Sequence, residues 1–165
     1  MKGKFMIIVP RSISPVNTIP RIHMPLGAVT VLSQAKEDGY EVKLLDTSIC
    51  DVNESNVDEY FKKNARIKKF DDKDFWITGM NDDEIVASIA EFDPDVIGFS
   101  CCTVVDREDT KYLVELVKDN FPNKKMFLGG YEIDKNYVNI LKKDAIERDK
   151  INNIDCISMG LGQVY

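Results

Sequence analysis

The sequence predicts an α/β protein built on a doubly wound, five-stranded parallel sheet. Short apolar runs recur along the 165 residues, and amphipathic segments lie between them. The runs are continuous rather than alternating, which is typical of strands that are buried on both faces. Regular alternation of strands and helices then predicts βαβ units with right-handed crossovers and helices on both sides of the sheet.

Each predicted strand is short and is followed by a small or polar residue. The strands are Phe5 to Val9, Val42 to Leu45 before Asp46, Val96 to Phe99 before Ser100, Met126 to Leu128 before Gly129, and Ile154 to Ile157. We expect a flavodoxin-like, Rossmann-like strand order. Ligands of such open sheets bind beyond the carboxyl ends of the strands.

The predicted helices have apolar residues at helical spacing. They are Leu26 to Asp38, Asp83 to Phe92, Asp106 to Asn120 and the shorter Lys135 to Lys142, and Gly39 and Pro122 are natural stops. The polar stretch from Ser48 to Asn81 departs from this pattern. We expect one helix around Val57 to Ile67 there and then a loop that contains Phe75 and Trp76. We interpret the stretch as an extended crossover, so that residues 1–165 form a single domain.

Composition excludes several classes of partner. A net charge of -6 gives no counterion release on nucleic acid, so DNA or RNA is not expected as a ligand. The N-terminal apolar run stops at Pro10, which is too short for a signal core or a membrane span. The chain is therefore expected to be cytoplasmic. The four cysteines have no CxxC spacing and are expected to be reduced thiols.

The loop after the first strand, from Pro10 to Gly27, is long and carries four prolines. Proline lowers the entropy of the free loop, so this one can form an ordered wall around a large ligand, with a surface Ω-loop as the alternative. No glycine precedes Gly27 in the loop, so the dinucleotide fingerprint GxGxxG is absent, and so is a P-loop. Pro10 and Ser100 stand where a phosphoacceptor receiver needs Asp.

Two further strand ends are candidates for ligand contact. Gly129-Gly130 permits positive φ or close approach of a ligand or another chain segment, although a plain tight turn explains the pair equally well. Ser100 offers a hydroxyl that can donate or accept one hydrogen bond, although alone it is an ordinary polar strand end.

Several segments, in order and spacing, carry a resemblance to a known family. They are Met24-Pro25-Leu26-Gly27, Gly39-Tyr40-Glu41-Val42 with Asp46, Gly79 to Ile85, Asp93 to Ser100, Leu128-Gly129-Gly130-Tyr131, and Ile154 to Ile157 leading to Gly160-Leu161-Gly162. Together they resemble the cobalamin-binding domain that precedes the radical S-adenosylmethionine (SAM) barrel in B12-dependent radical SAM enzymes. That group includes anaerobic magnesium-protoporphyrin ester cyclases and many methyltransferases.

The wider family of cobalamin domains carries a DxHxxG, SxL and GG pattern. Ser100 matches the Ser, with Cys102 in place of Leu, and Gly129 and Gly130 match the glycine pair. The resemblance implies that Ser100 contacts the dimethylbenzimidazole tail of cobalamin and that the glycines leave room for it. A buried aromatic base needs apolar walls and a partner for its ring nitrogen.

The DxHxxG part departs from the family. The segment from Arg21 to Gly27 has no Asp and has one extra residue before the glycine. His23, the only histidine, is a candidate cobalt ligand through its imidazole nitrogen. The alternative is that His23 packs near the corrin and that the lower face of cobalt has no protein ligand, as is frequent in the radical SAM group.

The resemblance implies a cofactor site but no catalytic residue in this chain. The implied cofactor-binding residues are Pro25, Leu26, Gly27, Ser100, Cys101, Thr103, Gly129, Gly130, Tyr131, Met159, Gly160 and Gly162. The CxxxCxxC motif of a SAM-cleaving 4Fe-4S cluster is absent, and in relatives it follows a turn that here reads Gly160-Leu161-Gly162-Gln163.

We therefore expect an N-terminal fragment whose partner is a radical SAM barrel in cis, with SAM and the 4Fe-4S cluster bound only in that absent C-terminal domain. The parent is expected to be a methyltransferase or to catalyse related radical chemistry. The alternatives are a stand-alone corrinoid carrier and a non-catalytic regulatory or interaction module.

Overall fold

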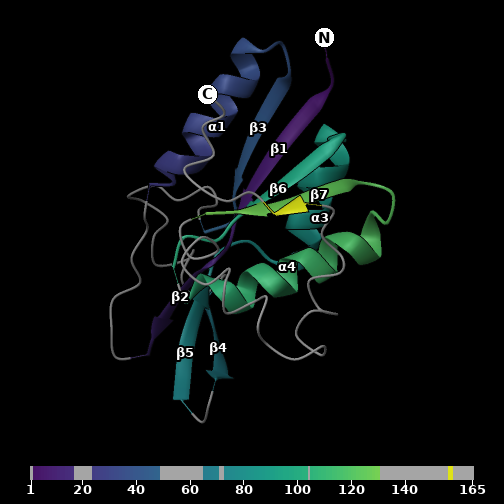
Figure 1. The fold of residues 1–165 in the computed structure, drawn as a ribbon. Helices are drawn as coiled ribbons and strands as arrows, with labels where there is room; N and C mark the ends of the chain where they lie inside the picture. Colours follow the sequence, from purple (N-terminus) through teal and green to yellow (C-terminus); the bar gives the residue numbers. More distant parts are fainter. Residues whose placement is uncertain are drawn as a thin grey trace, which may run out of the picture.

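The computed structural model describes residues 2–16, 24–48, 65–70, 73–103, 105–130 and 156–157. Its main sheet has the order β3-β1-β6-β7-β8, and all its neighbouring strands are parallel (Figure 1). The strands are β1 (Lys4–Val9), β3 (Glu41–Asp46), β6 (Val96–Ser100), β7 (Lys125–Gly129) and β8 (Cys156–Ile157). Within this sheet, β1 lies between β3 and β6, the next two of its strands along the chain. This is the flavodoxin-like order. The predicted α/β class and parallel sheet are confirmed.

The structure describes only part of the last predicted strand, Ile154 to Ile157. β8 has two residues, which pair with Phe127 and Leu128 of β7. The rest of the predicted range from Ile154, and the whole predicted helix from Lys135 to Lys142, lie outside the described residues.

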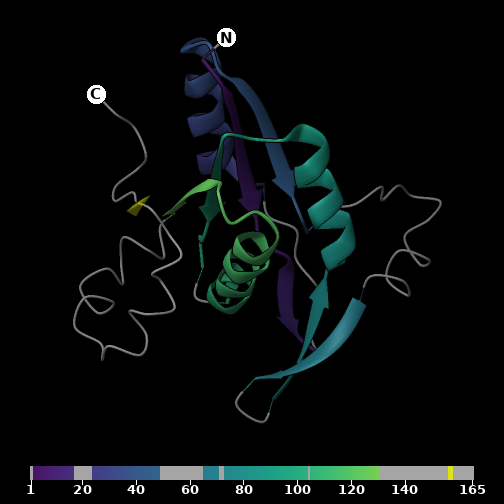
Figure 2. The same cartoon turned by 90° about the vertical axis from the view of Figure 1, so that its right-hand side faces the viewer.

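Helices cover both faces of the sheet, as predicted (Figure 2). Alternate residues of β1 point to opposite faces. Phe5 and Ile7 pack against Ala28 and Leu32 of α1 (Leu26–Glu37). On the other face, the core includes residues of β1, of α3 (Asp82–Phe92) and of α4 (Asp106–Asn120), namely Met6, Ile8, Ile85, Ile89, Leu113 and Val117.

Local sequence sets the limits of α3. The side chain of Asn81 accepts a hydrogen bond from the Glu84 amide, and the Glu84 carboxylate accepts one from the Asn81 amide, each over 2.9 Å. This capping box satisfies two backbone donors at the start of the helix. At the other end Asp93 adopts a left-handed conformation with φ 50°, and Pro94 follows. The helix ends there because proline disfavours a helical residue before it.

A second, antiparallel sheet of order β2-β5-β4 was not predicted. It consists of β2 (Ser12–Pro15), β4 (Ala65–Phe70) and β5 (Lys73–Thr78). Three expectations are therefore wrong. The segment after the first strand is not all loop, because it contains β2. Ile67 lies in a strand rather than in a helix, and Phe75 and Trp76 lie in a strand rather than in a loop. The other part of the predicted helix, residues 57–64, lies outside the described residues.

The second sheet escaped prediction in part because one of its two pairings is not local, whereas the other is a hairpin in which Phe70 of β4 pairs with Lys73 of β5. β5 pairs with β4 on one edge and with β2 on the other, and β2 comes from the loop after β1. Lys68 and Lys69 interrupt the apolar pattern of β4, and β5 begins with Lys73 and Asp74, so that tertiary pairing decides the structure of these segments.

The second sheet lies beyond the carboxyl end of β1 (Figure 1). Gly79 returns the chain from β5 to the main sheet, with φ 140°. A Cβ atom at this position would lie 2.1 Å from the carbonyl oxygen of Thr47, and the next amide, of Met80, donates to that same oxygen over 2.8 Å. The crossover from β3 to β6 therefore carries the two added strands β4 and β5 at the edge where a ligand is expected.

Candidate functional site

The carboxyl ends of four strands meet at one edge of the main sheet. In the pairing register, Val9 of β1 lies opposite Asp46 of β3, and Ser100 of β6 lies opposite Gly129 of β7. This edge joins two of the predicted site segments, Ser100 to Thr103 and Gly129-Gly130, because Cys101 donates its backbone N–H to the Gly129 carbonyl over 2.8 Å.

Ser100 and Gly129 lie on the α1 face of the sheet. Val96 and Phe127 pack against the α1 cluster, and strand residues two apart share a face. Gly98 lies between Val96 and Ser100 in β6, and a Cβ atom there would lie 2.4 Å from the Phe127 ring. Beyond Phe127, toward the carboxyl ends of the strands, this face therefore presents the hydroxyl of Ser100, the backbone of Gly129 and partly buried apolar side chains.

The Ser100 hydroxyl is buried, with 8% of the residue exposed. Its Oγ lies 3.4 Å from the Sγ of Cys102, and either atom can be the donor. Cys102 is exposed and Cys101 is buried. The side chain of Cys101 packs with the α3 and α4 core on the opposite face. Only the backbone of Cys101 therefore lies toward Gly129 and Gly130.

Gly130 is needed by the chain itself. Gly130 has φ 117°, and a Cβ atom there would lie 2.3 Å from the carbonyl oxygen of Cys101. A side chain at this position would therefore collide with the loop after β6. The close approach that we expected for the glycine pair exists at Gly130, and its partner within the described residues is the loop after β6.

The predicted residues at the start of α1 are open to solvent. Leu26 is 65% exposed, and a Cβ atom at Gly27 would meet nothing within 4 Å. Pro25 precedes the helix without a side-chain cap, and its carbonyl accepts from Val29. The start of α1 thus offers an exposed apolar surface. His23, Tyr131, Met159, Gly160 and Gly162 lie outside the described residues.

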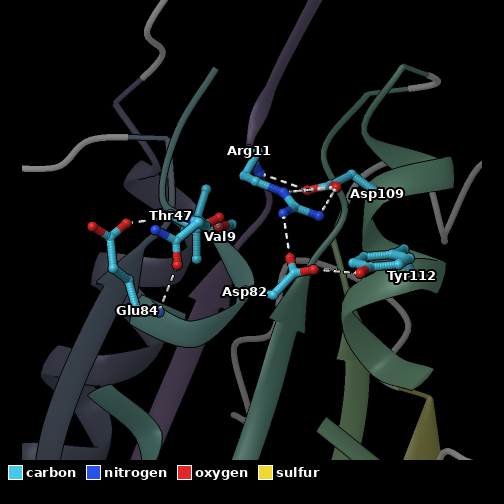
Figure 3. Close-up of polar contacts among 8 residues, drawn as sticks. Val9, Arg11, Thr47, Asp82, Glu84, Asp109 and Tyr112 are labelled. Atoms are coloured by element: carbon cyan, nitrogen blue, oxygen red, sulfur yellow. Dashed lines mark hydrogen bonds and ion pairs between the residues drawn. The ribbon is translucent and has the colours of Figure 1, made fainter. Parts of the chain in front are cut away.

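Sequence analysis missed a buried ionic cluster at the same edge (Figure 3). Arg11 follows β1 and is 2% exposed. Its Nε and Nη2 donate to the Asp109 carboxylate over 2.6 to 3.1 Å, and its Nη1 donates to Asp82 over 2.8 Å. The Arg11 guanidinium carbon lies 5.2 Å from the centre of the Tyr112 ring, and the Tyr112 hydroxyl donates to Asp82 over 2.5 Å.

The cluster keeps Arg11 charged. Burial lowers the pKa of Arg11, but hydrogen bonds and charge from Asp109, and then from Asp82, raise that pKa above its usual value. The one available signal in the sequence was an Asp at an inward position of the α4 pattern. A lone Arg in a proline-rich loop gives no pattern that identifies its partner.

The edge suits an aromatic, uncharged group better than a phosphate or a bare metal ion. The α1 face offers apolar walls from Val9 and Phe127 and the hydroxyl of Ser100. The Asp46 carboxylate at the end of β3 accepts from the amide and hydroxyl of Ser48. Within the described ranges, no three His, Cys, Asp or Glu side chains lie close enough together to hold a metal ion. The same part of the chain contains no helix long and apolar enough to cross a membrane.

Fold and edge together define an open parallel α/β domain, a class in which ligands bind at the carboxyl ends of the strands. The family of the B12 binding domain matches residues 15–160, so this chain belongs to the B12-binding domains, whose ligand is cobalamin.

Two relatives are similar over almost the whole chain. Cytidylyl-2-hydroxyethylphosphonate methyltransferase of Streptomyces wedmorensis is 26% identical over 161 residues, which cover 98% of this chain and 27% of the methyltransferase. A crystal structure of a cobalamin-binding protein from Desulfitobacterium hafniense has the same fold, with a TM-score of 0.55 at 14% identity, and the match covers 98% of this chain and 54% of that protein. The chain thus spans about a quarter and about half of the two relatives.

Proposed function

We propose that this domain holds cobalamin with its dimethylbenzimidazole tail on the α1 side of the sheet. The observation that carries the proposal is the Ser100 hydroxyl, which lies on that face at the end of β6 beside Gly129. A benzimidazole buried in protein needs apolar walls and a hydrogen-bond donor for its ring nitrogen. Val9 and Phe127 supply apolar surface, and Ser100 supplies the donor.

The remaining predicted residues divide between tail and corrin. Thr103, Gly129, Gly130 and Tyr131 would line the tail with Ser100, and Cys101 would contribute its backbone only. Pro25, Leu26 and Gly27 at the start of α1, with Met159, Gly160 and Gly162, would support the corrin. His23 remains a candidate cobalt ligand, and a lower cobalt face without a protein ligand is the alternative.

The larger protein is proposed to be a B12-dependent radical SAM enzyme. The motif order and spacing support this proposal, and so does the similarity to one part of a methyltransferase. When bound, cobalamin supplies the cobalt chemistry for methyl transfer or a related radical reaction, and the domain contributes placement. The alternatives are a stand-alone corrinoid carrier and a non-catalytic module on the same fold.

Ligand retention tests the tail site. Purified protein is mixed with hydroxocobalamin or with cobinamide, which lacks the nucleotide tail, and after gel filtration the visible spectrum is recorded. We expect retention of cobalamin and at least ~10-fold weaker binding of cobinamide, since a buried hydrogen bond and ring contacts are lost. Ser100→Ala should weaken cobalamin binding but not cobinamide binding, while Ser33→Ala, on the exposed face of α1, should change neither. Absence of corrin absorbance after filtration would refute the proposal.

Two observations separate the candidate parents. His23→Ala should leave the spectrum of bound cobalamin unchanged in the radical SAM case and should shift it in the carrier case, where the imidazole is the cobalt ligand. The natural reading frame beyond Tyr165 should encode CxxxCxxC if the parent is a radical SAM enzyme. A full-length protein without this motif would exclude that parent.

A further inference from the structure

We propose that Arg11 is a positioning residue for the loop from Ser100 to Thr103, and that it thereby sets the affinity for the tail of the ligand. The inference rests on the proposed function, in which this loop contacts the tail. Arg11 itself lies on the side of α3 and α4 and is 2% exposed, so it acts through other residues.

The first step is the fork between Arg11 and α4. Asp109 lies in the first turn of α4, and its carboxylate accepts from the backbone N–H of Arg11 over 2.9 Å as well as from the guanidinium. Main chain and side chain of one residue therefore fix the start of α4 against the end of β1. The planar guanidinium fixes orientation as well as distance, which lysine does not.

The second step runs from α4 to the loop. Asp106 lies in the same first turn, and its carboxylate accepts from the Thr103 amide over 2.8 Å, while its own amide donates to the Thr103 carbonyl over 3.1 Å. At its other end, the loop is held by the bond from the Cys101 amide to the Gly129 carbonyl. Displacement of the first turn of α4 therefore moves Thr103 while Cys101 stays attached to β7.

The cluster is better explained by geometry than by stability. Asp109 is almost fully buried, and Arg11 with it. Desolvation of two such charges consumes most of their mutual attraction, so that apolar replacements of similar size are often neutral or stabilising. A core of leucine and methionine would hold α4 against β1 without fixing its rotation. The ion pair instead specifies one arrangement, and Asp82 and Tyr112 complete it from the neighbouring helix and from α4 (Figure 3).

The test replaces the charges together, so that neither is left buried alone. Arg11→Met/Asp109→Leu in the full chain should still fold, with a melting temperature lowered only by the loss of one buried hydrogen bond, because the backbone N–H of residue 11 loses Asp109 as its acceptor. In the ligand-free variant, the Thr103 amide should exchange with solvent about 10-fold or more faster, while amides of β1 and β3 keep their protection. Affinity for cobalamin should fall by about 10-fold, and affinity for cobinamide should stay unchanged.

A second variant covers failure of the first to fold. Asp106→Ala removes the acceptor of the Thr103 amide without touching Arg11, and should give the same faster exchange and the same selective loss of cobalamin affinity. Lys111→Ala, which removes an exposed ion pair from α4, is the matched control and should change neither.

Unchanged Thr103 exchange or unchanged cobalamin affinity in a folded variant would overturn the positioning role. Failure of the parent protein to retain cobalamin would instead overturn the proposed function, and the exchange measurement would still decide the role of Arg11.

Discussion

Gly130 and Gly27, both predicted from the sequence to contact the ligand, differ sharply in what surrounds them. Gly130 has φ 117° and lies against the Cys101 backbone, while Gly27 has open space around it. Both were assigned to one ligand site from the same resemblance. Packing of the chain requires glycine at position 130, but it does not require glycine at position 27. Substitutions at the two positions therefore distinguish an effect on folding from an effect on binding.

Alanine at the two positions should act in opposite directions. Gly130→Ala should lower the free energy of unfolding by about 2–4 kcal/mol, because a left-handed conformation and a backbone clash are both penalised. Gly27→Ala should raise it by about 0.5 kcal/mol, because alanine favours the helix and meets no neighbour. Urea unfolding of the ligand-free protein measures both. A neutral Gly130→Ala would show that the loop after β6 does not pack against position 130.

A buried hydroxyl without a partner gives a second prediction at this scale. Ser14 Oγ, in β2, has no hydrogen-bond partner among the described residues. An unsatisfied buried polar atom destabilises the folded state, so Ser14→Ala should stabilise the ligand-free protein by up to about 1 kcal/mol. Ser100→Ala, whose hydroxyl has a sulfur partner, is the comparison and should give no gain in thermal melting. Destabilisation by Ser14→Ala would mean that the hydroxyl is bonded after all.

At the scale of elements, sequence analysis succeeded where neighbours in the chain decide the structure. The helices α1, α3 and α4 and four parallel strands follow local apolar patterns and local stop signals, such as Pro122 after α4. It failed for the pairing of β2 with β5, which lie far apart in the chain, and for the hairpin of β4 and β5, whose strands are rich in charged residues. It failed likewise for Arg11, because the residues that bind its guanidinium belong to two helices that come much later.

The start of α3 shows how much one local signal contributes. Asn81→Ala removes the side chain that accepts from the Glu84 amide and so breaks the capping box. The free energy of unfolding should fall by about 1 kcal/mol. Ser33→Ala within α1 serves as control for serine or asparagine replacement by alanine and should have little effect. A melting temperature of Asn81→Ala equal to that of the parent would show that the cap contributes nothing.

At the scale of the whole molecule, the edge is built from segments that fold for separate reasons. The parallel sheet follows from apolar patterning, the second sheet is added beyond its carboxyl ends, and the ionic cluster ties β1 to α3 and α4 (Figures 1 and 3). The α1 face holds the hydroxyl of the proposed tail site, and the opposite face holds the Arg11 cluster. The proposed ligand site and the proposed positioning cluster thus lie on different sides of one sheet.

Because the ligand contacts several of these segments in the proposed complex, cobalamin should stabilise the fold as a unit. A ligand that binds only the folded state at 100 times its Kd adds about 2.7 kcal/mol, which for a domain of this size raises Tm by roughly 5–10 °C. Each further tenfold increase in free ligand adds about 1.4 kcal/mol. Thermal melts over a series of hydroxocobalamin concentrations test this, with cobinamide as control, whose smaller shift follows from the lost tail contacts. A Tm that does not change over the series would mean that the folded domain has no preference for the ligand, and the assignment of the edge would then fail with it.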